Sequence, residues 1–235
     1  MTGEEGIVVR NVYRPGPEVR DGLGRFGVAT IHEAQGKKGL LEPALRPIYP
    51  GTHISGTAVT VSVPPGDNWM IHIAVEVCGE GDVMVVAPSS PSDAGYFGEL
   101  LATALMVREV RGLVIDAGCR DVAALREMGF PVWSKYVSAQ GTVKESLGSV
   151  NLPIVCAGQR VEPGDVVVAD DDGVVIVASD QAERVLEASQ QRESGEEATR
   201  KRYQEGELSL DVHSMREELE EKGLRYVDRE GAADR

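Results

Sequence analysis

Residues 82–133 decide the fold, and they read DVMVVAPSSPSDAGYFGELLATALMVREVRGLVIDAGCRDVAALREMGFPVW. Short apolar runs, typical of buried strands, alternate here with longer segments whose apolar residues recur at helical spacing. Alternation of this kind implies parallel strands joined by right-handed crossovers. The strands are expected at 82–88, 111–116 and 131–133, and the helices at about 98–110 and 121–128.

The flanking residues extend this pattern on both sides. Upstream, GTAVTVSV at 56–63 predicts a strand that ends at the Pro64-Pro65-Gly66 turn. Asp67 or Asn68 can then cap a helix that runs to about Cys78. Downstream, residues 136–178 are rich in β-formers and end in a hairpin that turns at Asp171-Asp172-Gly173. The sequence therefore predicts an α/β fold with a β-rich second half.

Charge density divides the chain near residue 180. Residues 180–235 hold 16 acids and 10 bases among 56 residues, with few large apolar side chains and many helix formers. Such a helix cannot bury itself on its own core, so we expect it to pack on a neighbouring subunit rather than project into solvent. The predicted organisation is an α/β domain at 1–179 and a charged helical arm at 180–235.

Composition excludes several classes of protein. The 235 residues include 24 Lys and Arg against 38 Asp and Glu, a net charge of −14, which argues against a nucleic-acid partner or an anionic membrane. The first residues include acids and contain no apolar run, which is unlike a signal peptide. The three cysteines are far apart and form no metal or disulfide pattern. We expect a cytoplasmic location.

The start of the helix at 98–110 is the first candidate binding element. The N–H groups of Glu99, Leu100 and Leu101 lie in the first turn, where they have no acceptor within the helix and where the helix dipole is positive. Gly98 lets a ligand approach this backbone closely. These amides form a natural seat for a carboxylate.

Arg120 and Asp121 form the second candidate element. They follow the strand at 111–116, at the carboxyl edge where open α/β sheets bind ligands. Arg120 can hold a carboxylate with two hydrogen bonds, and Asp121 is a hard oxygen ligand suited to Mg²⁺ or Mn²⁺. The alternative is structural, with Asp121 capping the next helix and Arg120 pairing with a surface acid. The residues alone favour neither interpretation.

Asn68, His72 and Glu76 share one face of the helix predicted after Gly66, since they are spaced by four residues. A solvent-facing stripe is the better interpretation of the three together. Asn68 is the strongest candidate among them, because side chains and free amides at a helix start point into clefts.

Several blocks in order along the chain now make the sequence recognisable. It resembles the 4-hydroxy-4-methyl-2-oxoglutarate / 4-carboxy-4-hydroxy-2-oxoadipate aldolases, a family of class II (metal-dependent) pyruvate aldolases. That family shares its fold with the regulator of ribonuclease E activity A. The blocks are GVATIHEAQG (27–36), PGDNWMIHIAVE (65–76), GYFGELLATAL (95–105), IDAGCRDVAAL (115–125), VSAQGTVKES (137–146), PIVCAGQ (153–159) and GDVVVADDDGVVIV (164–177).

The family's motif is a carboxylate, twenty residues, and then Arg-Asp, which matches Glu99 followed by Arg120 and Asp121. Glu stands here where that motif usually has Asp, so the carboxylate is one methylene longer. The resemblance implies that Glu99, Arg120 and Asp121 are catalytic. It also implies that Arg120 and the amides from Gly98 to Leu101 hold the pyruvyl group, and that Asp121 alone binds a divalent cation, Mg²⁺ or Mn²⁺, which water otherwise surrounds.

An outer group of residues is implied in the same way. Asn68 and Lys144 match positions near the distal part of the substrate. Glu33 matches an outer carboxylate, as does Glu196, which would reach from an adjacent subunit through the arm. We place His72 with this outer group.

The resemblance further implies a three-layer β/β/α swivelling-type domain that assembles as trimers, often paired into hexamers. The implied reaction is cleavage of 4-carboxy-4-hydroxy-2-oxoadipate to pyruvate and oxaloacetate. 4-Hydroxy-4-methyl-2-oxoglutarate would give two pyruvates, and oxaloacetate decarboxylation would be a side activity. The implied pathway is degradation of protocatechuate or gallate. The alternative is a non-catalytic, protein-binding regulator like the regulator of ribonuclease E activity A.

Overall fold

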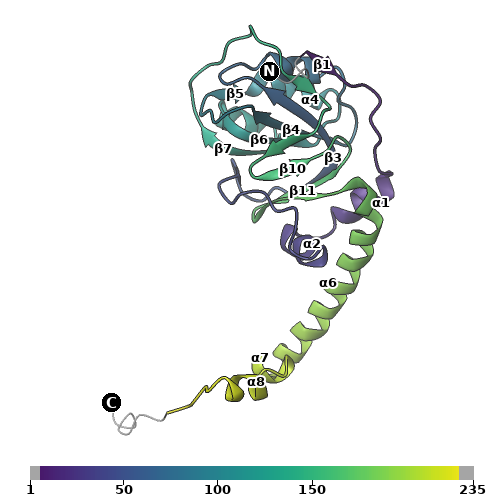
Figure 1. The fold of residues 1–235 in the computed structure, drawn as a ribbon, viewed down its shortest axis with the longest axis vertical. Coiled ribbons are helices and arrows are strands. Elements are labelled where there is room, and N and C mark those ends of the chain that lie inside the picture. The colour runs from purple at the N-terminus through teal and green to yellow at the C-terminus, as the bar shows by residue number, and fades with distance from the viewer. Residues whose placement is uncertain (1–5, 228–235) are drawn as a thin grey trace. The chain divides into compact units, whose positions relative to one another are not determined.

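The predicted β-α-β-α-β segment forms the centre of one mixed sheet (Figure 1). The computed structural model describes residues 6–227. Four long strands run parallel to one another, as expected from the alternation of strands and helices. In spatial order they are β3 (Ile54–Val63), β4 (Asp82–Pro88), β6 (Gly112–Cys119) and β7 (Val132–Val137).

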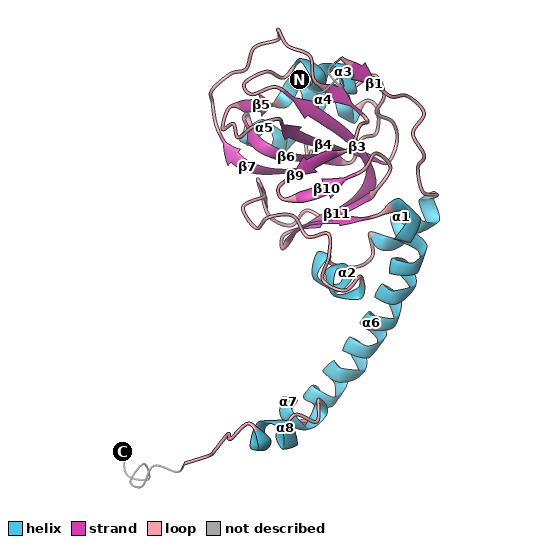
Figure 2. Ribbon diagram, viewed as in Figure 1, coloured by secondary structure: helices cyan, strands magenta, loops and turns pink. Residues whose placement is uncertain are grey.

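Three crossover helices cover one face of this sheet (Figure 2). They are α3 (Trp69–Ala74), α4 (Glu99–Met106) and α5 (Val122–Glu127). Their apolar residues pack on alternate side chains of the strands, for example Met84 and Val86 of β4. This contact makes the largest hydrophobic core of the protein.

β-structure covers the opposite face. Val83, Val85 and Ala87 of β4 point to this side and pack with the antiparallel pair β9 (Ile154–Cys156) and β10 (Gln159–Val161). The predicted hairpin forms β11 (Val166–Asp170) and β12 (Gly173–Val177), and β11 pairs with β3. The predicted three-layer β/β/α arrangement is therefore confirmed.

The remaining elements of the body surround this centre. Helices α1 (Pro17–Leu23) and α2 (Val28–Ala34) pack with the β11–β12 hairpin and the first residues of α6 (Ala182–Gln204) in a third core. A short 3₁₀ turn at Ser179–Gln181 precedes α6. Four short strands complete the sheet: β1 (Ile7–Val8), β2 (Arg46–Pro47), β5 (Gly95–Phe97) and β8 (Ser149–Val150).

The structure differs from the sequence-based expectations at several boundaries. β6 continues to Cys119 because β5, which falls in the predicted loop before Gly98, pairs with its last residues. The helix expected to reach Val110 ends at Met106, followed by a turn in which Glu109 has a φ of 59°. The helix expected to reach Cys78 likewise ends at Ala74.

The chain divides into two compact units, the first ending at Gln190 and the second beginning at Gln191. In the second unit α6 is followed by α7 (Ser209–Val212) and α8 (Arg216–Glu221). No residue between Gln191 and Val227 is buried, so local polar contacts hold these helices, such as the 2.8 Å contact between Tyr203 Oη and His213 Nε2. No helix between residues 6 and 227 combines the length and apolar character needed to cross a bilayer.

Arg14 and Asp82 form the most buried ion pair that joins distant parts of the body. Both carboxylate oxygens of Asp82 accept from the guanidinium, at 2.8 and 2.9 Å, and the Asp82 side chain is 1% exposed. Removal of Arg14 leaves a buried carboxylate without its cation, which commonly costs several kcal/mol.

We expect Arg14→Ala to lower the free energy of unfolding of the body by about 3–5 kcal/mol, measured by urea denaturation. The matched control is Arg160→Ala, because the side chains of Arg160 and its partner Glu162 are 70% and 44% exposed. Loss of this exposed ion pair should lower the free energy of unfolding by less than about 1 kcal/mol. Equal losses of unfolding free energy in the two variants would show that burial of the Asp82 carboxylate does not increase the contribution of Arg14 to stability.

Candidate active site

The candidate site forms where β5 lies along the end of β6. Gly95 and Phe97 pair with Gly118 and Cys119, and the Arg120 N–H donates to the Phe97 carbonyl at 2.8 Å. Since α4 begins directly after β5, this pairing brings the start of α4 beside the residues that follow β6. Predicted site residues 21 or more positions apart in sequence thus become neighbours.

Asp121 has an unusual backbone conformation at this point. Its φ and ψ are 58° and 35°, in the left-handed region that Asp tolerates better than most residues. Although it occupies the N-cap position of α5, its side chain makes no capping hydrogen bond there. Its Oδ2 instead accepts from the Glu99 N–H at 3.1 Å. The carboxylate thus joins the starts of two helices rather than capping its own.

Gly98 makes room for that carboxylate. A Cβ atom added to Gly98 would lie 2.2 Å from Asp121 Oδ2 and 3.1 Å from Arg120 Cγ. The backbone of Gly98 is extended, so the need for glycine here is one of space and not of conformation.

Arg120 lies beside the carboxylate and lines an open cleft. Its Nε is 3.8 Å from Asp121 Oδ2, and no other acid within residues 6–227 forms an ion pair with it. The side chains of Arg120 and Asp121 are 47% and 45% exposed. The cleft has a volume of about 460 Å³ and is lined by Arg120, Asp121, Val122, Val137, Ser138 and Ala139. The geometry therefore leaves both charged groups accessible to a ligand.

The first turn of α4 contributes fewer free amides than the sequence predicts. The Glu99 N–H is already bonded to Asp121, whereas the N–H groups of Leu100 and Leu101 meet no protein acceptor in the described part of the chain. The Glu99 side chain is exposed at this edge. The N–H groups of Gly98, Leu100 and Leu101 and the Arg120 guanidinium thus remain for an anionic ligand, since the Gly98 N–H also meets no acceptor among residues 6–227.

Asn68 lies on the other side of β5. Its Nδ2 donates to the Tyr96 carbonyl at 2.9 Å, and it is 5% exposed. Its Oδ1 is buried and has no hydrogen-bond partner among residues 6–227. A buried amide oxygen without a donor is costly, so this atom has the capacity to accept from a ligand or water.

One loop, residues 138–146, connects the two parts of the site. At its start the Gly95 N–H donates to the Gln140 carbonyl at 2.7 Å, and a Cβ on Gly141 would lie 3.6 Å from Arg120 Nη1. At its end Lys144 lies close enough to His72 that its charge, together with burial, lowers the pKa of that histidine. The structure therefore brings Lys144, His72 and Asn68 to the same side.

Two predicted residues are not joined to this cluster within one chain. Glu33 lies on α2, which packs on β11 and β12, and its carboxylate is 3.5 Å from Lys37 Nζ. Glu196 belongs to the second unit and pairs with Arg192 at 2.9 Å. A role for either residue at the site stays a prediction.

Tyr96 and the full role of Asp67 were not predicted from the sequence. Tyr96 is 1% exposed, and its hydroxyl accepts from the Gly66 N–H at 2.5 Å. Asp67 or Asn68 was predicted as the helix cap, and Asn68 is the N-cap residue, although its side chain makes no capping bond. Asp67 lies one residue earlier; its Oδ1 accepts from the Trp69 N–H at 2.9 Å and its Oδ2 binds the loop. The close spacing of Gly95 and Gly98 around two aromatic residues was the available signal for β5.

The donor set at the cleft suits a hard cation that keeps most of its water. No group of three or more His, Cys, Asp and Glu side chains arranged to hold a metal occurs among residues 6–227, so a closed zinc site is not formed there. Mg²⁺ is commonly held by one or two carboxylates and several waters, and the half-exposed Asp121 fits that pattern. Cys119 is fully buried, and burial raises the pKa of its thiol, which makes it a poor nucleophile.

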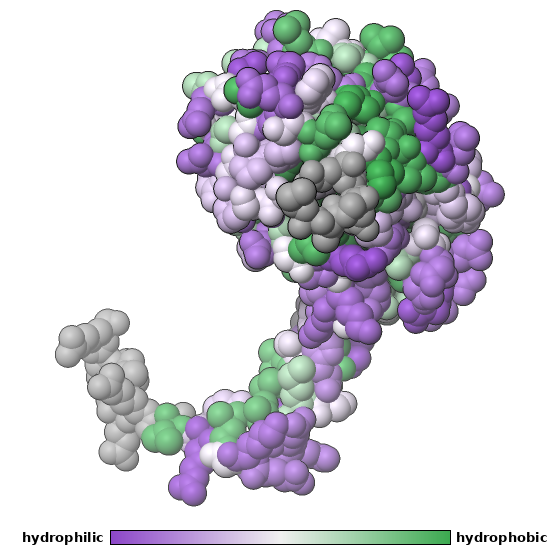
Figure 3. Space-filling view, turned by 45° about the horizontal axis from the view of Figure 1, so that its top comes forward, coloured by the Kyte–Doolittle hydropathy of each residue, from purple (hydrophilic) through white to green (hydrophobic). Residues whose placement is uncertain are grey.

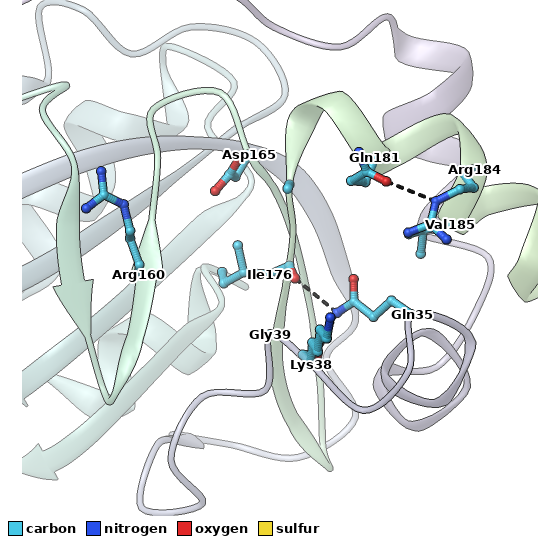
Figure 4. Close-up of a pocket in the computed structure, with 10 residues that line it drawn as sticks. Gln35, Lys38, Gly39, Arg160, Asp165, Ile176, Gln181, Arg184 and Val185 are labelled. Carbon is cyan, nitrogen blue, oxygen red and sulfur yellow. Dashed lines mark hydrogen bonds between the residues drawn. The ribbon is translucent and has the colours of Figure 1, made fainter.

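A second cavity lies away from these residues (Figure 4). It has a volume of about 370 Å³ and includes Lys38, Arg160 and Arg184 among its lining residues. The one acid that lines it, Asp165, already accepts from the N–H groups of Glu162 and Ser179 at 2.9 and 3.0 Å. None of the predicted site residues lines this cavity.

Hydrophobic surface is also present on the body, as Figure 3 shows for the face turned toward the viewer. Near the cleft, Leu100 of α4 is 84% exposed and Val137 of β7 is 66% exposed. Large exposed apolar side chains that gather beside a site are typical of a surface that contacts another protein.

Comparison with known proteins agrees with this architecture. A model of the RraA-like family, described as Aldolase/RraA, matches residues 18–176, and the chain belongs to this family. The resemblance identified from the sequence is thus confirmed at the level of the family.

Relatives carry two kinds of description. A Halalkalibacterium halodurans protein named "Putative 4-hydroxy-4-methyl-2-oxoglutarate aldolase" is 28% identical over 77% of this chain and 83% of its own length. A Burkholderia multivorans protein of the same name is 32% identical over 62% and 88%. A solved Streptomyces coelicolor structure, described as an unusual member of the RNase ES inhibitor RraA protein family, is 28% identical over 81% and 99%, with a TM-score of 0.72.

Gly98→Ala tests the packing of Asp121. The new methyl group should displace the carboxylate from the Glu99 N–H, so hydrogen exchange of that amide should accelerate about tenfold, as expected for the loss of one hydrogen bond. Gly141→Ala is the control, because its Cβ meets Arg120 only at an ordinary 3.6 Å contact. Unchanged exchange of Glu99 in Gly98→Ala would show that the carboxylate is not held as described.

Proposed function

We propose that this protein is a divalent-metal-dependent aldolase acting on 4-hydroxy-2-oxo acids that carry a 4-carboxylate. The observation that carries the proposal is the junction of Asp121, Arg120 and the start of α4 at the carboxyl edge of the sheet. Membership in the Aldolase/RraA family and the names of its relatives support it. The proposed substrates are 4-carboxy-4-hydroxy-2-oxoadipate, cleaved to pyruvate and oxaloacetate, and 4-hydroxy-4-methyl-2-oxoglutarate, cleaved to two pyruvates.

Asp121 is the residue that would hold the cation, with Mg²⁺ or Mn²⁺ as the proposed ion. When bound, the cation supplies Lewis-acid polarisation of the substrate's 2-oxo group. The carboxylate is oriented for this role by the Glu99 N–H and by the left-handed backbone at Asp121. Because these contacts are preformed, the ligand atom needs no rearrangement when the substrate enters.

The protein's own donors would stabilise the charge that develops on the substrate. The amides of Leu100 and Leu101 are placed to hold the substrate's C1 carboxylate at the α4 N-terminus. When the C3–C4 bond breaks, its electron pair moves toward the 2-oxo oxygen, and Arg120 donates to that oxygen as its charge grows. Glu99, exposed at the same edge, would hold the water that returns a proton to C3.

Proton removal from the C4 hydroxyl requires a base, which we assign to a water held by a carboxylate. Glu33 and Glu196 are the proposed carboxylates, with Glu196 supplied by a neighbouring subunit. The exposed apolar residues beside the cleft and the second unit, which buries none of its described residues, support a homo-oligomer. A trimer, or a pair of trimers, is the proposed assembly.

Asn68 and Lys144 would bind the substituent at C4. The free Oδ1 of Asn68 would accept from the C4 hydroxyl, and Lys144, whose neighbour Val143 is bonded to the Asn68 backbone, would supply a positive charge to a carboxylate substituent. Decarboxylation of oxaloacetate forms the same pyruvate enolate, so it is the proposed side activity. Degradation of protocatechuate or gallate is the proposed pathway, in the cytoplasm.

A protein-binding regulator is the second candidate function. The Streptomyces coelicolor structure supports it, because its description names an RNase ES inhibitor and its fold covers 81% of this chain. A regulator needs neither accessible Arg120 and Asp121 nor free amides at α4, and it would turn over no substrate. A metal-dependent assay of pyruvate release from the oxoadipate substrate separates the two candidates.

Chelation tests the metal. Since one carboxylate offers weak and exchangeable binding, EDTA should abolish pyruvate release, and added Mg²⁺ or Mn²⁺ should restore it. Pyruvate is measured with a coupled dehydrogenase after the chelator has been removed. Full activity of an exhaustively chelated protein would contradict a metal-dependent aldolase.

Substitutions separate the roles of Arg120 and Asp121. Arg120→Lys should bind Mn²⁺ almost normally but lose about 10²-fold in kcat, because Lys cannot reproduce the planar two-point grip on the developing charge. Asp121→Ala should lose metal binding and activity together, measured by calorimetric Mn²⁺ titration and by turnover.

Asp93→Ala, at an exposed aspartate in the loop before β5, is the control and should keep both properties. Near-native kcat in Arg120→Lys, or tight Mn²⁺ binding in Asp121→Ala, would show that these roles are wrongly assigned.

A further inference from the structure

The Asp67 carboxylate binds backbone from two separate elements. Its Oδ1 accepts from the Trp69 N–H at 2.9 Å, at the start of α3. Its Oδ2 accepts from the N–H groups of Glu145 and Ser146, each at 2.7 Å, at the end of loop 138–146. Asp67 is only 1% exposed. One oxygen is sufficient to begin the helix, so the other is available to hold the loop.

The carboxylate stays ionised despite its burial. Burial would raise the pKa of Asp67, but the three backbone donors and the charge of Lys144 outweigh it, and the pKa is lowered. An ionised acceptor makes stronger hydrogen bonds than a neutral one. The contact is thus a strong attachment between α3 and the loop.

Backbone hydrogen bonds extend this attachment along the loop. The Val143 N–H donates to the Gly66 carbonyl at 2.9 Å, and the Asn68 N–H donates to the Val143 carbonyl at 3.2 Å. Lys144 therefore lies between two residues, Val143 and Glu145, whose backbones are both attached to the segment that carries Asn68. The Lys144 side chain itself remains exposed.

We propose that Asp67 is a positioning residue that holds Lys144 beside Asn68, so that the lysine charge meets a carboxylate on the C4 substituent of the substrate. This inference rests on the proposed function and extends it to substrate preference. The carboxymethyl group at C4 of 4-carboxy-4-hydroxy-2-oxoadipate carries a charge that the methyl group of 4-hydroxy-4-methyl-2-oxoglutarate lacks. Asp67 thereby favours the more highly charged substrate without touching it.

Binding of 2-oxoadipate tests the proposal without requiring turnover. This compound has the distal carboxylate but no 4-hydroxyl, so it cannot undergo the cleavage. Pyruvate is the matched probe that lacks the distal carboxylate. Both are titrated calorimetrically into the full-length protein in the presence of Mg²⁺.

Asp67→Ser is the informative variant. A serine hydroxyl can still accept from the Trp69 N–H two residues ahead, but it is too short to reach Glu145 and Ser146 as well. We expect 2-oxoadipate to bind about tenfold or more weakly, as for the loss of a charged contact, and pyruvate to change by no more than about twofold. Lys144→Ala should show the same selective loss.

The double variant tests whether Asp67 acts through Lys144. If it does, Asp67→Ser added to Lys144→Ala should weaken 2-oxoadipate binding no further. Multiplying losses would overturn the positioning role, as would selective weakening in the control Asp165→Asn. Asp165 is a suitable control because it is 4% exposed and also accepts two backbone N–H groups, but it lies in the cavity of Figure 4.

Hydrogen exchange provides a second readout. The amides of Glu145 and Ser146 should exchange faster in Asp67→Ser than in the wild type, measured without ligand, and unchanged exchange would overturn the proposal. Failure of the proposed function looks different. A wild-type protein that binds 2-oxoadipate through Lys144 but releases no pyruvate from the oxoadipate substrate would refute the aldolase and leave the positioning role supported.

Discussion

The pairing of β5 with the end of β6 is the constraint on which the candidate site depends. It extends β6 to Cys119, so Arg120 and Asp121 emerge beside α4 rather than in a loop away from it. A Cβ on Gly118 of β6 would lie 2.6 Å from the carbonyl of Ala94, the residue before β5, which shows how closely the two backbones approach. With β5 displaced, the Glu99 N–H and the Asp121 carboxylate would have no reason to meet.

Two aspartates use the same physical device around this pairing. Asp67 and Asp121 each stand where a helix begins, and each gives a carboxylate oxygen to backbone N–H groups of another segment. The charge thereby satisfies donors that a helix start or a loop leaves unpaired. In this way α4 is held to α5, and loop 138–146 is held to α3, by polar contacts at the rim of the sheet, while the apolar core lies beneath them.

Some proteins similar to this chain are named "Putative 4-hydroxy-4-methyl-2-oxoglutarate aldolase", and others are described as members of an RNase inhibitor family. The fold alone therefore does not decide between these functions. What favours catalysis here is specific to the site. Arg120 and Asp121 are half-exposed and have no alternative ion-pair partners in the described chain, and Asp121 does not cap its helix. Charged side chains with a purely structural role would be expected to form their ion pairs and hydrogen bonds with nearby groups of the protein.

Sequence by itself determined the parallel strands, the crossover helices and the β-rich second half, because hydrophobic period and turn residues are local properties. It also selected Arg120 and Asp121, since residues after parallel strands share one edge of the sheet. Only the tertiary structure placed β5 on β6, turned the Asp121 carboxylate to Glu99 and attached Lys144 through Asp67. Those contacts join residues that lie 22 to 79 positions apart, and no local pattern encodes which distant N–H group a carboxylate will find.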